Sequence, residues 1–159
     1  MKKKILSIAL GLVLIAFTTN TYAADKTPVS GAKLTPGEKA VKDFNKQFKN
    51  SISPAVYSVN GGIILQSLAD GHNVTLAYDK KGNWVYTIKR YPTESLAKDI
   101  LDIVTGSYNT YGYFITRMEK IDQPGIKSIY VVHMQNSNSY KTLRVSDDEV
   151  ELIQDFKKI

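Results

Sequence analysis

The sequence predicts an α+β domain in which an antiparallel sheet carries two helices on one face. Two stretches with apolar residues at helical spacing each precede several short runs in which apolar and polar residues alternate. Glycine-containing turns separate those runs. Helices and strands do not alternate one by one, as they do in parallel sheets. We therefore expect antiparallel pairing, with an arrangement of helix and β-meander that occurs twice along the chain.

The first helix is expected to begin after Thr35. Residues 35–38 have the form of a capping box, in which Thr35 and Glu38 each accept a backbone N–H of the other and Pro36 occupies the first helical position. Asn50 and the Ser53-Pro54 pair are expected to end this helix. An apolar stripe at helical spacing consists of Val41, Phe44 and Phe48.

Four strands are expected after this helix. Each predicted turn between them supplies glycine, which favours tight reversals of the chain. The runs rich in β-branched and aromatic residues cover 56–59, 63–68, 74–78 and 84–89.

A second helix is expected after Pro92, with Thr93 as its N-cap and Gly106 as its stop. Its apolar stripe consists of Leu96, Ile100, Ile103 and Val104. Further strands are predicted over 111–120, 126–134 and 141–145.

The tail allows two interpretations. Residues 146–149 could cap a short helix, or they could form a turn before a last strand over 150–156. We favour the strand, because Arg144-Val145 and Val150-Glu151 would then flank a compact hairpin turn.

The N-terminus has the features of a signal peptide. Three lysines precede an apolar run too short to span a bilayer stably, and Thr21 and Ala23 are the small residues expected before a cleavage site. We predict a signal peptide over 1–23, a flexible leader over 24–34 and one domain over 35–159. The protein is then periplasmic or secreted, with no stable membrane anchor after cleavage.

The composition limits the possible functions. Of 159 residues, 43% are hydrophobic and 23% charged, and cysteine is absent, which excludes disulfides, thiolate metal sites and a cysteine nucleophile. The net charge of +6 includes the three lysines of the signal peptide; without them 18 basic residues face 15 acidic ones, a charge of +3. Nucleic-acid binding is not expected from so mild and dispersed an excess.

No catalytic or metal site can be assembled from the sequence. His72 and His133 are the two side chains that titrate near neutral pH, and we interpret His72 as an exposed turn residue. No nucleophile-elbow motif and no phosphate-binding glycine motif is present. We therefore predict a protein without enzymatic activity, cofactor or metal.

Parity along the strands predicts which side chains the open sheet face carries. Pairing Val74, Leu76 and Tyr78 with Trp84, Tyr86 and Ile88 as the covered face leaves Thr87 and Lys89 outward. For the later strands, taking Phe114 with Met118, Val132 with Met134 and Leu143 with Val145 as covered leaves outward an apolar strip of Ile115, Ile129 and Val131 beside polar residues. The predicted binding residues on the open face are Thr87, Lys89, Tyr113, Arg117, His133 and Arg144.

The sequence also resembles a known family. The stretch 74–88, with its turn and aromatic strand start at 78–84, is followed by a proline and an amphipathic helix, then by 113–117 and 129–132. In this order the segments are similar to the PepSY-like proteins of Bacteroidetes, also described as β-lactamase-inhibitor-protein-like, over approximately 36–156. The resemblance implies a small exported α+β domain without enzymatic activity whose open sheet face contacts a protein.

Two functions follow as hypotheses. The first is an exported binding module that holds a protein or peptide of the cell envelope on its open sheet face. The alternative is a periplasmic carrier or sensor with an apolar ligand in a pocket between helices and sheet, which needs a concavity of roughly 300 Å³ or more.

Overall fold

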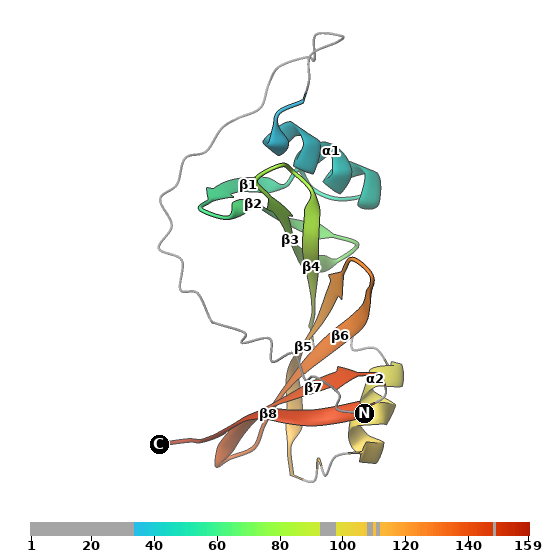
Figure 1. The fold of residues 1–159 in the computed structure, drawn as a ribbon. Coiled ribbons are helices and arrows are strands. Elements are labelled where there is room, and N and C mark those ends of the chain that lie inside the picture. Colours follow the sequence, from blue (N-terminus) through green and yellow to red (C-terminus); the bar gives the residue numbers. More distant parts are fainter. Residues whose placement is uncertain (1–33, 93–97, 108–109, 111, 148) are drawn as a thin grey trace, which may run out of the picture.

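A computed structural model of the chain describes residues 34–92, 98–107, 110, 112–147 and 149–159. The predicted signal peptide, most of the leader and the predicted cap Thr93 lie outside these residues. The described part contains two helices and one antiparallel sheet of eight strands, paired in chain order (Figure 1). In order the elements are α1 (Pro36–Gln47), β1 (Ala55–Val59), β2 (Gly62–Ala69), β3 (His72–Asp79), β4 (Trp84–Tyr91), α2 (Lys98–Ser107), β5 (Phe114–Gln123), β6 (Ile126–Gln135), β7 (Ser139–Ser146) and β8 (Glu149–Lys157).

The predicted antiparallel α+β fold is confirmed, and the tail is a strand rather than a helix. Val145 pairs with Val150 and Arg144 with Glu151, so the predicted compact turn joins β7 to β8. Asp147 in this turn has φ of 52°, a left-handed conformation that aspartate tolerates better than most residues. The strand over 111–120 was predicted too early, since β5 begins at Phe114.

The capping box predicted for α1 is present. The Thr35 backbone N–H donates to Glu38 Oε2 at 2.8 Å, and the Glu38 N–H donates to Thr35 Oγ1 at 3.3 Å. The bond from the Thr35 N–H lowers the pKa of Glu38 below its usual range, because it stabilises the carboxylate. The helix ends at Gln47, well before the Ser53-Pro54 pair, since Phe48 already leaves the helical conformation.

α1 covers the strands β2 and β3 with its apolar stripe. Ala40 and Phe44 are fully buried, and Phe48 at the helix end is nearly so. Tyr78 donates from its hydroxyl to Asp43 Oδ2 at 3.0 Å, which joins β3 to the helix. The buried residues of this α1 cluster are Ala40, Phe44, Phe48, Ile63, Leu65, Ala69, Val74, Leu76 and Tyr78.

The β3–β4 turn holds the start of α1. Lys39 Nζ donates to Asn83 Oδ1 at 2.6 Å. A Cβ on Gly82, which has φ of 72°, would lie 2.6 Å from the carbonyl oxygen of Pro36. Glycine is needed here for the left-handed backbone and for the close approach of the turn to the helix.

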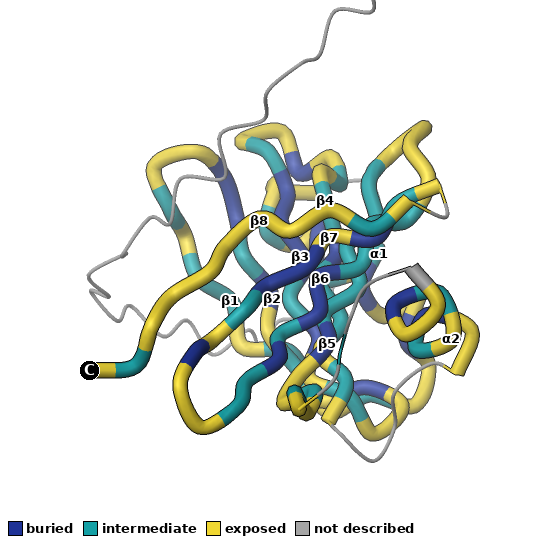
Figure 2. The backbone as a smooth tube through the Cα atoms, turned by 90° about the horizontal axis from the view of Figure 1, so that it is seen from below, coloured by how far each residue is buried: buried dark blue, intermediate teal, exposed yellow. Residues whose placement is uncertain are grey.

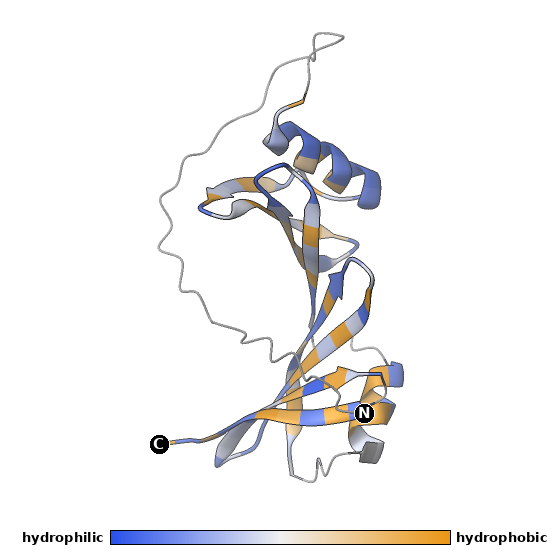
Figure 3. Cartoon of the chain, viewed as in Figure 1, coloured by the Kyte–Doolittle hydropathy of each residue, from blue (hydrophilic) through white to orange (hydrophobic). Residues whose placement is uncertain are grey.

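α2 forms a second cluster with the later strands (Figure 1). Its Ile100 and Val104 are buried, as expected from the stripe, and α2 also contacts β8. The sheet residues of this α2 cluster alternate along β6 and β7. The strands β5 to β8 carry bands of hydrophobic and hydrophilic residues (Figure 3). The buried residues are Ile100, Val104, Met118, Val132, Met134, Leu143 and Val145.

The strand β8 forms one edge of the sheet and is exposed along most of its length (Figure 2). At the other edge lies β1, which has five residues. Neither helix in the described segments is long and apolar enough to cross a lipid bilayer.

Candidate functional site

Three of the six predicted binding residues lie together. Arg117 on β5 pairs with His133 on β6, and Arg144 on β7 pairs with Val131, two residues before His133. Their strand neighbours Met118, Val132 and Leu143 belong to the α2 cluster, so Arg117, His133 and Arg144 point to the opposite side. We call this side of β5 to β8, with Arg117, His133, Thr142 and Arg144, the Arg117 face.

Thr87 and Lys89 lie on the side that α1 covers, not on an open face. Thr87 pairs with Leu76, is 3% exposed and accepts a hydrogen bond from Trp84 Nε1 at 2.9 Å. Lys89 Nζ lies 5.2 Å from the centre of the Phe48 ring, a cation–π contact with α1.

A bulge explains this error in parity. The register between β3 and β4 shifts between Ala77 and Tyr78, so that Tyr78 pairs with Trp84 but Ala77 pairs with Tyr86. Beyond the bulge, residues 86–89 lie on the sides opposite to those predicted. Tyr86 and Ile88, predicted as covered by α1, therefore face away from it.

Tyr113 also lies on a different side from the predicted one. It packs against the α2 cluster, and its hydroxyl lies 2.7 Å from Ser139 Oγ. Lys141 Nζ lies 5.4 Å from its ring centre. A second bulge, between Ile115 and Arg117, separates the parity of Tyr113 from that of the Arg117 face.

His133 is held through both ring nitrogens. Arg117 Nη2 lies 3.2 Å from Nε2, and Thr142 Oγ1 lies 3.3 Å from Nδ1. Because a guanidinium can only donate, Nε2 accepts and the ring of a neutral His133 carries its proton on Nδ1. Thr142 then accepts this proton in a hydrogen bond and donates its own to Gln154 Oε1 at 3.2 Å.

Burial, and then the positive charge of Arg117, lower the pKa of His133 below its usual range, while Glu119 opposes this shift. As the pH falls below about 6.5, the unfolded chain takes up a proton on this histidine before the folded chain does. The folded state therefore loses stability as the pH falls through that value toward the lower pKa of the folded state.

We expect His133→Gln to remove this part of the pH dependence. Urea unfolding between pH 7.5 and 5 should show wild-type stability falling more steeply than that of the variant. Since both proteins keep the same carboxylates, the difference between their curves isolates His133. Two parallel curves over this range would contradict the assignment.

The charges of the Arg117 face are only partly balanced. Glu119 accepts from Arg90 Nε at 3.0 Å and lies 3.4 Å from Arg117 Nε, so one carboxylate serves two guanidinium groups. Arg144 and Glu151 form a separate pair at 3.6 Å. Such exposed pairs contribute little to stability. The three arginines face only two glutamates, so one positive charge among these five residues is uncompensated.

The predicted apolar strip is split between the two sides. Ile129 and Val131 lie on the Arg117 face, whereas Ile115 packs against the α2 cluster. Ile121 pairs with both Ile129 and Ile88, which continues the apolar strip across β4, β5 and β6. Val131, flanked by Glu119 and Arg144, is only 8% exposed.

His72 differs from the expected exposed turn residue. It begins β3, is half-buried, and its ring centre lies 4.7 Å from that of Tyr91. Its Nδ1 is buried without a hydrogen-bond partner among the described residues.

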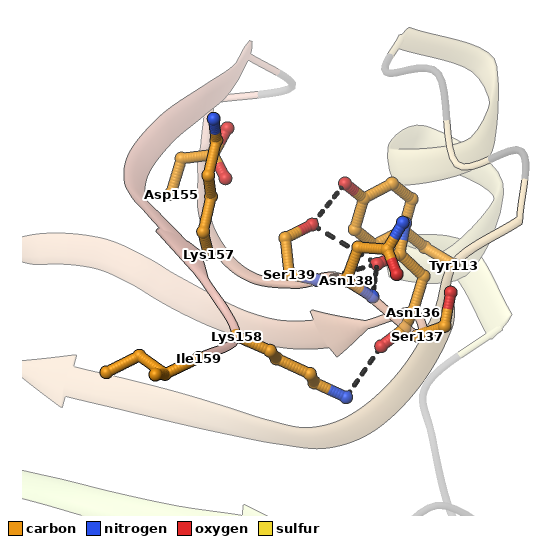
Figure 4. A pocket seen from close by; sticks show the side chains of 9 residues that line it. All are labelled: Tyr113, Asn136, Ser137, Asn138, Ser139, Asp155, Lys157, Lys158 and Ile159. Carbon is orange, nitrogen blue, oxygen red and sulfur yellow. Dashed lines mark hydrogen bonds between the residues drawn. The ribbon is translucent and has the colours of Figure 1, made fainter.

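A hollow that the sequence did not indicate lies at the β6–β7 turn (Figure 4). Its volume is about 650 Å³. It is lined by Tyr113, residues 136–139, Asp155 and residues 157–159. Most of these side chains are polar, so this hollow is not the apolar pocket between helices and sheet that a carrier would need.

Comparison with known proteins gives similarities of fold. No protein-family model matches the sequence, and no curated protein matches it significantly. A solved BLIP-like (β-lactamase-inhibitor-protein-like) protein from Bacteroides fragilis is 15% identical to this chain in sequence. The two structures match with a TM-score of 0.61, over 79% of this chain and 88% of the other. The chain has a BLIP-like fold.

Two further solved structures share this BLIP-like fold. A DUF2874 family protein from Bacteroides ovatus is 14% identical with a TM-score of 0.61, over 79% of this chain and 89% of the other. A protein from Bacteroides eggerthii, described as a candidate periplasmic protein, is 7% identical with a TM-score of 0.60, over 76% and 87% of the two chains. The β-lactamase-inhibitor-protein-like part of the predicted resemblance is thus confirmed at the level of the fold.

Proposed function

We propose that this chain is an exported, non-enzymatic binding module that contacts a protein or peptide through the Arg117 face. The observation that carries the proposal is the ordered set of arginines and the histidine on that face. Arg117, Arg144 and Arg90 have side chains about half exposed, and each lies within 3.6 Å of a carboxylate oxygen of Glu119 or Glu151. Arginine in a fixed geometry is a residue of choice for recognising carboxylates and aromatic rings of a partner.

The proposal takes both helices to lie on one side of the sheet. Support comes from β4, where Lys89 contacts Phe48 at the end of α1 and Tyr91, two residues later, packs against the α2 cluster. Residues two apart on a strand point to the same side. The other side, which includes the Arg117 face, is then free to receive a partner.

Export is supported by the N-terminal pattern of the sequence. Its basic start, short apolar run and small residues near Ala23 are typical of a signal peptide that is removed. The description of the Bacteroides eggerthii structure as a candidate periplasmic protein agrees with such a location.

The absence of enzymatic activity is supported by the state of His133. Both of its ring nitrogens are engaged, and its pKa is shifted away from neutrality, which does not suit a general base at neutral pH. Among the residues that the structure describes, no three His, Asp or Glu side chains gather to hold a metal ion. The BLIP-like description of one neighbour adds an analogy of fold alone.

We expect charge reversal on the Arg117 face to abolish capture of the partner. Crosslinking in the native cell envelope, followed by identification of the crosslinked protein, should recover a defined partner with the wild-type chain. The double variant Arg117→Glu and Arg144→Glu should lower that recovery by about tenfold or more, because like charges then meet across the contact.

Lys42→Glu provides a control in which one charge is reversed on another surface, since Lys42 is an exposed basic residue on α1. Its recovery should equal that of the wild type. Equal recovery by all three proteins would show that the Arg117 face is not the contact surface.

A further inference from the structure

Three exposed aromatic side chains line up across four strands at one end of the sheet. Phe114 pairs with Gln135, Gln135 pairs with Tyr140, and Tyr140 pairs with Phe156. The aromatic members are 57%, 50% and 58% exposed, respectively. Since neighbouring strands lie about 4.8 Å apart, this aromatic row of Phe114, Gln135, Tyr140 and Phe156 spans roughly 14 Å.

The aromatic row belongs to the Arg117 face. Its neighbours Ile115 and Met134 pack in the α2 cluster, so Phe114 and Gln135 point the opposite way. The next row of the sheet runs from Arg117 through His133 and Thr142 to Gln154. A mainly aromatic row and a polar row therefore lie side by side on one surface.

Positive charge borders the aromatic row on two sides. Lys158 Nζ lies 4.5 Å from the centre of the Tyr140 ring and donates to the Asn136 carbonyl oxygen at 2.6 Å. Arg117 lies in the neighbouring row, with Nη2 against His133. Neither row contains a carboxylate, and Glu119, one row further, is already shared between two arginines.

The exposed aromatic side chains contribute little to the core, because none of them is among the residues of the α2 cluster or packs against it. Contiguous exposed apolar surface with a polar rim is typical of a recognition site. Tyrosine and arginine are also the residue types that most often dominate binding energy at protein interfaces. A second copy of this chain would bring Arg117 and Lys158 toward their own counterparts, which disfavours self-association through this row.

We propose that the aromatic row, with Arg117 and Lys158, binds a protein segment in which an apolar or aromatic side chain is flanked by carboxylates. This inference rests on the proposed binding function and names the chemistry of its partner. The apolar anchor would pack on the rings of Tyr140 and Phe156. The flanking carboxylates would lie near Arg117 and Lys158. The partner would then complement this surface both in charge and in polarity.

The test uses two blocked pentapeptides as probes. One has a central tryptophan with two glutamates on each side, and the other has glutamines in their place. Each is titrated into the isotope-labelled full chain, expressed with its own N-terminus, while amide chemical shifts are followed. We expect shifts at the four residues of the aromatic row, and about tenfold tighter binding of the glutamate peptide at low salt, a preference that ~0.5 M NaCl removes.

Variants separate the two parts of the proposal. Phe156→Ser should weaken both peptides, whereas Arg117→Gln should weaken the glutamate peptide alone. Ile126→Ser, at an equally exposed apolar residue at the opposite end of β6, should change neither affinity.

Two results would overturn the inference. Equal affinity of both peptides at every salt concentration would refute the acidic partner, yet shifts lost in Phe156→Ser would still support a binding function for this face. Shifts that appear on dilution of the protein alone would instead identify a second copy as the occupant. Whether the Arg117 face binds at all is decided separately, by the recovery of a partner in the crosslinking experiment.

Discussion

Replacing Phe44 by alanine is expected to lower the free energy of unfolding by about 4 kcal/mol. The Phe44 side chain is fully buried, and its ring centre lies 5.2 Å from that of Phe48. α1 contributes three buried side chains to its cluster, and Phe44 is the largest that is completely enclosed. Alanine would leave a cavity that the paired strands of the sheet cannot collapse to fill.

Phe114→Ala is the matched control, because it removes the same side chain from a position that is 57% exposed. Its loss of stability should stay below about 1 kcal/mol. Urea unfolding of the two variants measures both values, and Phe44→Ala should also lower Tm by more than about 10 °C. Similar losses in the two variants would contradict the packing of α1 described above.

The order of elements could be predicted because its signals are local. Gly71 and Gly125 adopt left-handed φ values of 77° and 69° in tight turns, which most other residues tolerate poorly. Thr35 and Glu38 likewise indicate a helix start within four residues. Each of these signals depends on a few neighbours along the chain, so a short stretch of sequence is enough to recognise it.

The face to which a side chain points could not be predicted so well, because bulges reverse parity. One bulge between Ala77 and Tyr78 moved Thr87 and Lys89 beneath α1. A bulge is stabilised by pairing between strands and by packing, and no residue type marks it in the sequence. Arg117 points outward as predicted because it lies after the bulge, next to the covered Met118. Phe114, for which the same alternation predicts the covered face, lies before the bulge and points outward.

The aromatic row could not be predicted from the sequence for the same reason. Val145 pairs with Val150, and an unbroken hairpin would continue to pair Tyr140 with Asp155. The bulge between Thr142 and Leu143 instead pairs Tyr140 with Phe156. The exposed aromatic pair on the Arg117 face therefore depends on one extra residue in β8, which alternation along the sequence does not indicate.

A close approach between two strands gives the second large effect, at Gly62. A Cβ built on Gly62 would lie 1.9 Å from the carbonyl oxygen of Tyr78 and 2.9 Å from its carbonyl carbon. Both are backbone atoms, so no side-chain rotation can relieve the overlap. Tyr78 cannot easily move either, since it is 2% exposed and its hydroxyl donates to Asp43.

We expect Gly62→Ala to lower the free energy of unfolding by about 3 kcal/mol, because β2 and β3 must separate next to the bulge at Tyr78. Gly61→Ala is the control one residue earlier, where an added Cβ has no atom within 4 Å; its effect should stay within about 0.5 kcal/mol. Urea unfolding of both variants decides the matter. Two equal, small effects would mean that β2 and β3 do not approach each other this closely at Gly62.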